Sequence, residues 1–405
     1  MKKQKIEDLA IFGDTPVFKE KLHVGRPNIG DKKNLLDRVS DVLDSGWLTN
    51  NGPNVQEFEL RLAEIIGVKH CFAVCNATVA LQIAARALEL KGEVILPSFT
   101  FIASAHALKW INITPVFCDI DPNTHNIDPS KIEMLISPRT TGIIGVHVWG
   151  RPCDVETITQ IAEQNDLKVL CDAAHAFGSS FQRKMIGGFG DAEVFSFHAT
   201  KIFNTFEGGA ITTNNDQLAH KISLMRNFGF HGIDNVIELG TNGKMNEISA
   251  AMGLTSLESI DDFIKINKRN YDCYQSELGD IQGLKLIHYD ENERSNFQYF
   301  VVEVDGIKAG VSRDLLVKVL YAENILARRY FYPGCHQLEP YRTLVPDVGL
   351  RLQETEKLVT RVMCLPTGTA ISITDIMQIC SIIRFTLTHS KKISELLSSG
   401  LTGFG

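Results

Sequence analysis

The sequence lacks any long hydrophobic run. Of its 405 residues 44% are hydrophobic and 22% are charged, and no window approaches the roughly 18 apolar residues that a membrane span needs. The first residues, Met1-Lys2-Lys3, are not followed by an apolar stretch, which argues against a secretory signal peptide. We therefore expect a globular cytoplasmic protein without a membrane partner.

Long basic runs and glycine-rich dinucleotide signatures are also missing. The formal net charge is -7, and an acidic chain without basic runs offers no surface suited to nucleic acid. The absence of a G-x-G-x-x-G motif removes the obvious dehydrogenase interpretation. Internal repeats, low-complexity segments and linker-like runs are not found, so any lobes are expected to pack together rather than to be tethered.

Cysteine is sparse and irregularly placed. The nine cysteines are an odd number, scattered through apolar segments, which is typical of small buried side chains in a reducing compartment. Cys71 and Cys75 are separated by three residues and have no partner pair at zinc-ligand spacing. We therefore expect no metal site.

Length and hydrophobic pattern indicate two lobes, because 405 residues exceed the usual size of a single core. Short apolar strands alternate with helices through the first half of the chain, which predicts an α/β fold with a mostly parallel sheet and helices on both faces. Ligands bind such sheets beyond the carboxyl ends of the strands. The expected strands are 71–75, 93–96, 115–119, 142–149 and 168–172, and the expected helices are 77–90, 100–109 and 155–165.

A second region begins near residue 262, where the pattern changes to that of a smaller α+β lobe. We divide the chain into an N-terminal arm (1–40), a large domain (41–262) and a small C-terminal domain (263–405). The elements expected in the small domain are helices at 263–278, 312–323 and 350–362 and strands at 284–288 and 299–304.

The segment between Asp172 and Gly209 contains an acid and an amine at the ends of apolar stretches. Asp172 ends the apolar run that starts at residue 169, and the strand-like segment 195–201 ends in hydroxyls and the amine of Lys201. Pyridoxal phosphate needs these groups, since a lysine holds it as a Schiff base and a carboxylate keeps its ring nitrogen protonated. The pattern therefore predicts a pyridoxal phosphate site.

Each of these residues has a simpler interpretation. An aspartate at the end of a strand is often a helix cap, and Phe101 could be an ordinary core aromatic. Gly208 and Gly209 could serve only a tight turn or a bulge. Lys201, however, lies between apolar stretches, where an amine is costly unless it is used or its pKa is lowered.

Four motifs are distributed along the chain: SGWLTNNGP at 45–53, PSFTF at 97–101, DAAHA at 172–176 and SFHATK at 196–201. Through these motifs the chain, from about Gly46 onward, resembles the DegT/StrS family of sugar-nucleotide aminotransferases. The resemblance implies the fold of type I pyridoxal phosphate enzymes, with a large domain around a mostly parallel mixed sheet and a smaller α+β C-terminal domain. Within the family, the run 197–209 is most similar to enzymes that make dTDP-4-amino-4,6-dideoxyglucose, the viosamine and desosamine branch.

The resemblance implies roles for the residues around the cofactor ring. Lys201 matches the catalytic lysine, which binds the cofactor and moves the proton between substrate and cofactor. Some relatives have histidine there and dehydrate their sugar instead, so lysine favours amino transfer. Asp172 matches the partner of the pyridinium nitrogen, Phe101 the ring that stacks on the cofactor, and His175 a residue near the ring oxygen, although a histidine beside small residues is by default part of the core.

Other residues are implied at the phosphate and at the substrate. Ala77 and Thr78 open a helix, where free N–H groups and the positive end of the dipole suit a phosphate; many relatives have glycine in place of Ala77. Ser196 matches a further phosphate ligand, and Asn242 resembles the asparagine that reaches the phosphate of a neighbouring subunit. Candidates for contact with the sugar nucleotide or the donor carboxylate, each equally consistent with a structural role, are His198, Arg226, His231, Lys244 and Tyr330.

The function implied by the resemblance is a ping-pong transfer of an amino group. L-Glutamate would give its amino group, leaving 2-oxoglutarate, and C4 of dTDP-4-keto-6-deoxy-D-glucose would receive it, giving dTDP-4-amino-4,6-dideoxy-D-glucose. A homodimer with shared active sites is expected. The alternatives are a 3-amino or a GDP- or UDP-sugar aminotransferase of the family, a sugar dehydratase, another pyridoxal phosphate enzyme such as a C–S lyase, and a non-catalytic member. The sequence does not fix the sugar, its nucleotide or the stereochemistry.

Overall fold

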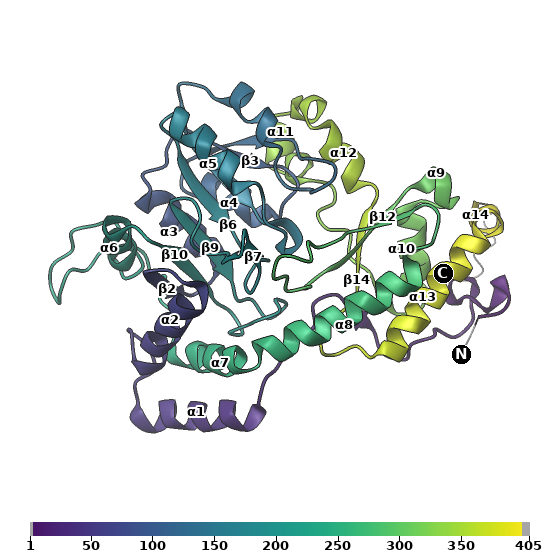
Figure 1. Cartoon of the computed structure of the whole chain (residues 1–405), viewed down its shortest axis with the longest axis horizontal. Coiled ribbons are helices and arrows are strands. Elements are labelled where there is room, and N and C mark those ends of the chain that lie inside the picture. The colour runs from purple at the N-terminus through teal and green to yellow at the C-terminus, as the bar shows by residue number, and fades with distance from the viewer. Residues whose placement is uncertain (1–2, 399–405) are drawn as a thin grey trace.

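The centre of the protein is a seven-stranded sheet in the order β2-β10-β9-β6-β5-β3-β4, seen in a computed structural model that describes residues 3–398 (Figure 1). All neighbouring strands are parallel except β10, which runs antiparallel to β2 and β9. The predicted mostly parallel mixed sheet is therefore confirmed. The strands are β2 (His70–Val74), β3 (Glu93–Pro97), β4 (Thr114–Cys118), β5 (Thr140–Val146), β6 (Lys168–Asp172), β9 (Ala192–Ser196) and β10 (Gly209–Thr213).

Helices cover both faces of this sheet. One face packs against α3 (Ala77–Ala87), α4 (Ile102–Trp110) and α6 (Asp216–Met225), and the other against α2 (Pro53–Ile66), α5 (Val155–Gln164) and α7 (Glu247–Glu258). Because successive side chains of a strand point to opposite faces, neighbours on β6 belong to different layers. Leu170 joins the core under α3 and α4, whereas Cys171 joins the core under α5.

The long helix α8 (Ile260–Leu278) leads from the large sheet to a second core (Figure 1). This core surrounds an antiparallel sheet of β11 (Leu284–Leu286), β12 (Phe300–Val304) and β14 (Val362–Leu365). It is completed by α9 (Gly306–Ala309), α10 (Arg313–Ala322), α13 (Ile373–Thr388) and α14 (Ser390–Ser398).

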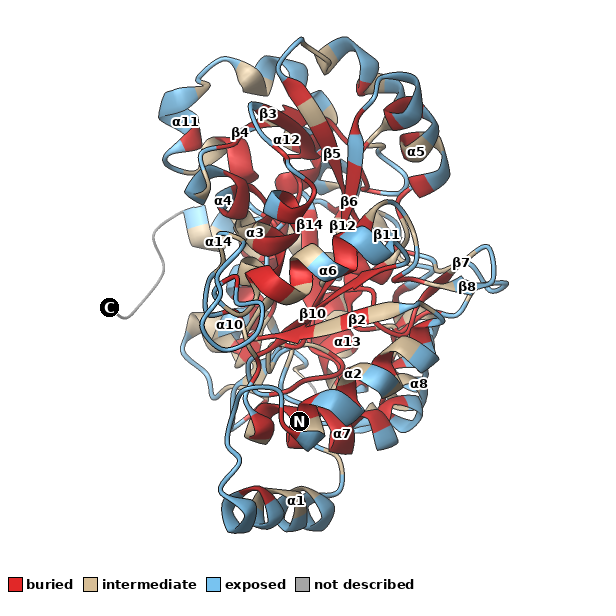
Figure 2. Ribbon diagram, turned by 90° about the vertical axis from the view of Figure 1, so that its left-hand side faces the viewer, coloured by how far each residue is buried: buried red, intermediate tan, exposed pale blue. Residues whose placement is uncertain are grey.

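The N-terminal segment packs against this second core rather than against the large sheet. Leu9 and Phe18 are buried in it, and β1 (Leu22–His23) pairs in parallel with β13 (Ile325–Leu326). The next helix, α1 (Lys32–Ser45), contacts α7 and is otherwise largely exposed (Figure 2). The remaining short elements are β7 (Ser180–Phe181), β8 (Lys184–Met185), α11 (Tyr341–Leu344) and α12 (Gln353–Val359).

Some element boundaries differ from the sequence predictions. The strand predicted at 142–149 ends at Val146, because the chain turns and Trp149 takes a left-handed conformation with φ 64°. The helix predicted at 77–90 ends at Ala87, shortly before Glu89 at φ 60°. The helix predicted at 350–362 is wrong at its end, because residues 362–365 form β14 and pair with β12.

None of the helices in the described part of the chain combines the length and the hydrophobicity needed to cross a bilayer. All nine cysteines are free thiols, and only Cys75 and Cys273 are not buried. This burial agrees with the predicted use of cysteine as a small apolar side chain.

Candidate active site

A cavity of about 710 Å³ lies at the carboxyl ends of β6 and β9, beside the N-terminus of α3. Its position follows the rule for open α/β sheets, in which ligands bind beyond the carboxyl ends of the strands. The fold thus brings together residues from separate parts of the sequence. The predicted site residues that line this cavity are Ala77, Thr78, Phe101, Asp172, His175, Ser196, His198, Lys201 and Tyr330.

Asp172 is held at the end of β6 by two hydrogen bonds. The hydroxyl of Ser104 on α4 donates to Oδ2 at 2.7 Å, and the backbone N–H of Ala174 donates to Oδ1 at 3.1 Å. Thr100 lies next to Ser104, with the two hydroxyl oxygens 3.0 Å apart. The carboxylate is therefore fixed at the cavity wall with lone pairs left for a ligand that donates a proton.

Lys201 lies in the turn that follows β9, where its backbone N–H donates to the carbonyl of His198 at 2.9 Å. Burial lowers the pKa of its amine to about 8, although the negative charge of Asp172 opposes this shift. No carboxylate of the described residues forms an ion pair with the amine. A lysine with a lowered pKa supplies the neutral amine that covalent and proton-transfer chemistry requires.

The N-terminus of α3 is arranged to receive an anion. The side chain of Asn76 caps the helix by accepting the N–H of Val79 at 2.9 Å, which leaves the first backbone N–H groups, those of Ala77 and Thr78, directed at the cavity end of the helix. Gly209 allows β10 to lie close against this end of α3, because a Cβ at Gly209 would lie 2.9 Å from the nitrogen of Ala77.

His175 carries a buried ring nitrogen, Nδ1, that has no hydrogen-bond partner among the described residues. Its ring stacks on Phe331, with centroids 5.9 Å apart, and meets the edge of Tyr299 at 4.9 Å. Burial, with the charge of Lys201, lowers the pKa of His175 well below its usual value, so the ring is neutral. A buried polar atom without a partner, on a residue that lines a cavity, is a place for a ligand atom.

These groups fit pyridoxal phosphate. A carboxylate, an amine of lowered pKa, a helix N-terminus with a nearby hydroxyl and an unpaired ring nitrogen converge on one cavity. They match the ring nitrogen, the aldehyde, the phosphate and the ring oxygen of the cofactor.

Three further predicted residues lie at the cavity wall. Phe101 is 56% exposed and lines the cavity, so its interpretation as a core aromatic is wrong. His198 contacts Thr200, with Nδ1 2.8 Å from the hydroxyl, and its Nε2 lies 3.4 Å from Glu207. The ring of Tyr330 lies beneath a guanidinium group, that of Arg328, at 5.2 Å. All three can therefore touch a ligand larger than the cofactor.

The other predicted residues do not line the cavity of their own chain. Arg226 pairs with Glu59 and donates to the carbonyl of Ala73 at 3.1 Å, contacts that are structural. The amine of Lys244 bonds Asn227 at 3.0 Å and lies 4.4 Å from the ring centroid of Phe228. Asn242 bridges to Asn227, and His231 approaches His220, with ring centroids 6.2 Å apart. Their predicted roles at the cofactor or the substrate stay predictions.

Two residues at or beside the cavity were missed by the sequence reasoning. Ser104, which bonds Asp172, lies one turn after Thr100 on a helix that follows a strand end, and that spacing was the available signal. Arg328 lines the cavity, and its signal was the Arg328-Arg329 pair directly before the aromatic run 330–332.

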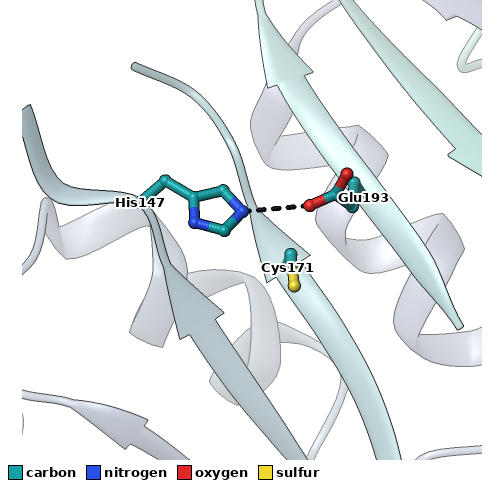
Figure 3. Close-up of side chains that lie close together, drawn as sticks. All are labelled: His147, Cys171 and Glu193. Atoms are coloured by element: carbon teal, nitrogen blue, oxygen red, sulfur yellow. Dashed lines mark hydrogen bonds and ion pairs between the residues drawn. The ribbon is translucent and has the colours of Figure 1, made fainter. Parts of the chain in front are cut away.

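A second polar cluster lies on the opposite face of the sheet, behind Asp172. It consists of His147, Cys171 and Glu193, whose ligand-type atoms lie within 4.8 Å of one another (Figure 3). Nδ1 of His147 accepts the backbone N–H of Cys153 at 3.1 Å, so Nε2 carries the proton that is shared with Glu193 at 2.9 Å. Because this proton occupies the lone pair that a metal would need, the cluster is a buried hydrogen-bonded pair rather than a prepared metal site.

Comparison with known sequences agrees with this geometry. A model of the DegT/DnrJ/EryC1/StrS aminotransferase family matches residues 30–384. A protein of Shigella dysenteriae named dTDP-4-amino-4,6-dideoxy-D-glucose transaminase is 40% identical over 374 residues, which cover 92% of this chain and 99% of that protein.

Solved structures show the same fold. DesI in the presence of its TDP-sugar product has a TM-score of 0.92 and 45% identity, covering 97% of this chain and 100% of that one. The PLP form of the putative sugar aminotransferase Spr1654 from Streptococcus pneumoniae has a TM-score of 0.82 and 25% identity, covering 93% and 99%. The predicted type I fold of pyridoxal phosphate enzymes is thus confirmed. The chain belongs to the DegT/DnrJ/EryC1/StrS aminotransferase family.

Proposed function

We propose that this protein is a pyridoxal phosphate-dependent aminotransferase that moves an amino group from L-glutamate to C4 of dTDP-4-keto-6-deoxy-D-glucose. One observation carries the proposal: the identity to a transaminase named for the expected product extends over nearly the full length of both chains. The lysine at position 201 supports amino transfer rather than dehydration, and its lowered pKa suits the chemistry.

The cofactor, when bound, supplies an electron sink for a carbanion next to nitrogen. Asp172 would hold the ring nitrogen, and Phe101 would cover a face of the ring. The phosphate would bind the N-terminus of α3 at Thr78, together with Ser196, since backbone N–H groups and hydroxyls converge there.

Lys201 would carry the proton in both half-reactions. With its amine neutral, Nζ would remove the proton from Cα of L-glutamate in the first half-reaction. In the second it would return a proton to C4 of the hexose. The partial burial that lowers its pKa to about 8 keeps a useful fraction of the amine neutral near pH 7.

We infer that the protein works as a homodimer with shared active sites. The segment 228–239 exposes apolar side chains, and Asn242 lies three residues beyond it, outside the cavity of its own chain. Clustered exposed apolar residues are typical of association surfaces. Those on this segment and on or near α1 and α2 are Leu36, Leu43, Trp47, Leu48, Leu60, Ile65, Phe228, Phe230, Ile233, Val236, Ile237 and Leu239.

Absorbance spectroscopy tests the function directly. L-Glutamate should convert the band of the lysine-bound cofactor into that of its amine form, and dTDP-4-keto-6-deoxy-D-glucose should restore it. Conversion by glutamate without restoration by this sugar would keep the aminotransferase and reject the substrate. In that case, 3-keto, GDP- and UDP-linked sugars would be compared in the same cuvette. Failure to acquire any cofactor band would reject the proposal as a whole.

A further inference from the structure

A short segment that precedes β12 of the second core is bonded to the turn that carries His175. The side-chain amide of Asn296 donates to the carbonyl of His175 at 2.7 Å and to that of Phe177 at 2.9 Å. Its Oδ1 accepts the backbone N–H of Gln298 at 3.0 Å. Asn296 and Gln298 are both buried. The segment is therefore held against the end of β6, beside the cavity.

Gln298 is bonded in turn to the segment that carries Lys201. Its Oε1 accepts the backbone N–H of Ile202, the residue directly after Lys201, at 3.2 Å. The carbonyl of Ile202 accepts an N–H of the Asn28 side chain at 2.9 Å. Because all the bonded residues are buried, water does not compete for these hydrogen bonds. Lys201 is thus followed by a residue whose N–H and carbonyl are both fixed by buried amides.

The chain between the two amides of this segment has an uncommon conformation. Phe297 has φ 49°, in the left-handed region that residues other than glycine rarely adopt. Such a conformation persists only where the surrounding contacts impose it. Tyr299, which follows Gln298, lines the cavity and meets the ring of His175 at 4.9 Å. Residues 296–299 therefore link the second core to both turns of the candidate active site.

We propose that Gln298 is a positioning residue for Lys201. This inference rests on the proposed function, in which the amine binds the cofactor and then moves protons. A displacement of about 1 Å in such a group can cost a hundredfold in rate. The amine of Lys201 has no ion-pair partner in residues 3–398, so its placement depends on its backbone. By accepting the N–H of Ile202, Gln298 fixes the point from which Lys201 reaches into the cavity.

The two asparagines of this network are less selective targets for a test. Asn296 holds two carbonyls of the turn after β6. Asn28 also accepts the N–H of Thr369 at 3.2 Å and its hydroxyl at 2.8 Å. The side-chain oxygen of Gln298 acts on the Lys201 turn itself. Replacing Gln298 therefore disturbs that turn more directly than replacing either asparagine.

Two forms of the cofactor test this role, because only one of them bonds to Lys201. Pyridoxal phosphate binds Lys201 through its aldehyde, whereas pyridoxamine phosphate has an amine in that place and relies on its ring and phosphate contacts. Gln298→Met removes the acceptor at nearly constant volume and should weaken pyridoxal phosphate binding about fivefold or more. Its affinity for pyridoxamine phosphate should stay within about twofold of the wild type. Calorimetric titration of the cofactor-free full chain with each form measures both affinities.

Further variants separate positioning from support of the fold. Gln275→Met is the matched control, because Gln275 also bonds a backbone group, the carbonyl of Ile287 at 3.2 Å, but does not line the cavity. Both of its affinities should equal those of the wild type. Gln298→Asn withdraws the amide by one methylene group and should reproduce Gln298→Met. Gln298→Glu keeps an oxygen for the N–H of Ile202 and should lie near the wild type. Melting temperatures verify that each variant is folded.

The ratio of the two affinities decides the outcome. Equal losses for both forms of the cofactor in Gln298→Met would overturn the inference in favour of general support of the fold. Unchanged affinity for both forms, or a loss in Gln298→Glu as large as that in Gln298→Met, would also overturn it. Each of these results would leave the proposed function intact. If the wild type bound neither form of the cofactor, the proposed function itself would fail.

Discussion

Lys201 and Asp172 line one cavity, but the structure holds them in different ways. The carboxylate of Asp172 is fixed by donors on α4 and in the following turn, whereas the amine of Lys201 has no ion-pair partner in residues 3–398. A group that only orients and polarises a cofactor gains from rigidity. A group that alternately binds and moves protons needs freedom, and this difference agrees with the two proposed roles.

Replacing Lys201 by alanine should abolish turnover and leave the fold intact. Without the amine, proton transfer at Cα and at C4 loses its carrier, and a loss on the order of a thousandfold or more is expected. The measurement is steady-state turnover, with circular dichroism melts to compare stability. Lys221→Ala is the control, because Lys221 forms a surface pair with Glu89. Activity near the wild-type level in Lys201→Ala would remove this residue from the mechanism.

Replacing Asp172 by asparagine should retain part of the cofactor binding and lose rate. The amide keeps the size of the side chain but cannot hold a proton on the ring nitrogen as a carboxylate does. A fall in kcat on the order of a hundredfold is expected, comparable to the loss of one electrostatic contact in other active sites. Cofactor content by absorbance, measured beside kcat, separates weak binding from slow chemistry. Full activity would show that Asp172 has no catalytic part.

The lowered pKa of Lys201 predicts a pH-dependent stability of the cofactor-free protein. The folded pKa is about 8 and the ordinary value is 10.5, so between these values the unfolded chain binds more protons than the folded one. Below this window the folded protein bears the full cost of burying the charged amine of Lys201. That cost falls as the pH rises across the window, so the free energy of unfolding increases with pH there. Lys201→Met should raise Tm at pH 7 by about 2 °C or more. Scanning fluorimetry should show this gain shrinking at pH 10, and a gain independent of pH would contradict the shift.

The sequence predicted the site residues whose chemical type the cofactor requires. It did not predict those whose position at the site depends on how the helices and strands pack. An aspartate and a lysine at strand ends are recognisable because few side chains can do their work. Ser104 was missed, since its bond to Asp172 depends on how α4 lies against β6. Arg328 was missed for the same reason: only the fold shows that it lines the cavity.

At the level of elements, the contact between β10 and α3 controls the proposed phosphate site. Gly209 begins β10, and a Cβ there would lie 2.7 Å from the carbonyl oxygen of Phe195 and 2.9 Å from the nitrogen of Ala77. Any larger residue would push the helix N-terminus away. The glycine is thus required by close approach and not by a turn, which the sequence alone left open.

Replacing Asn76 by alanine should affect both the helix and the cofactor. Loss of its cap on Val79 should cost about 1 kcal/mol of unfolding free energy. Because α3 then frays at the proposed phosphate site, cofactor affinity should fall as well. Asn215→Ala removes an equivalent cap from α6, away from the cavity. Denaturation curves should show similar losses for both variants, with cofactor titration distinguishing them. Equal cofactor affinity in the two would argue against a phosphate at α3.

The parallel strands were predictable because their short apolar runs alternate with helices. The predicted strand 168–172 matches β6, and 93–96 lies within β3. The end of the predicted helix 350–362 was wrong because β14 is apolar and adjoins α12, and its pairing with β12 is decided by residues far away in sequence. Long-range pairing of this kind leaves little local signal.

For the whole molecule, a shared active site can be tested by mixing two inactive variants. Lys201→Ala and Asn242→Ala should each be impaired, because one lacks the lysine and the other the proposed partner contact. In a hybrid dimer one site would regain both residues. Mixing with subunit exchange should therefore restore activity to about a quarter of the wild-type value. Activity assays before and after exchange, with light scattering for mass, measure this. A monomer, or no recovery from two folded variants, would refute the shared site.

We propose that the chain divides into the N-terminal arm, the large domain and the small domain predicted from the sequence. The burial of Leu9 and Phe18 in the second core supports treating the arm as a separate segment that returns to the far end of the chain. The proposed boundary at residues 262 and 263 falls inside α8 rather than in a loop.

That helix joins the two cores without a break. Phe263 is buried in the core of the large sheet, whereas Tyr274 and Leu278 are buried in the second core. At 1.5 Å per residue its 19 residues form a rod of about 28 Å. Both ends of α8 are packed into a core, so a hinge movement between the two cores would require this helix to bend. We therefore expect the two cores to keep their relative position during turnover, so that a ligand enters the cavity without a hinge movement between them.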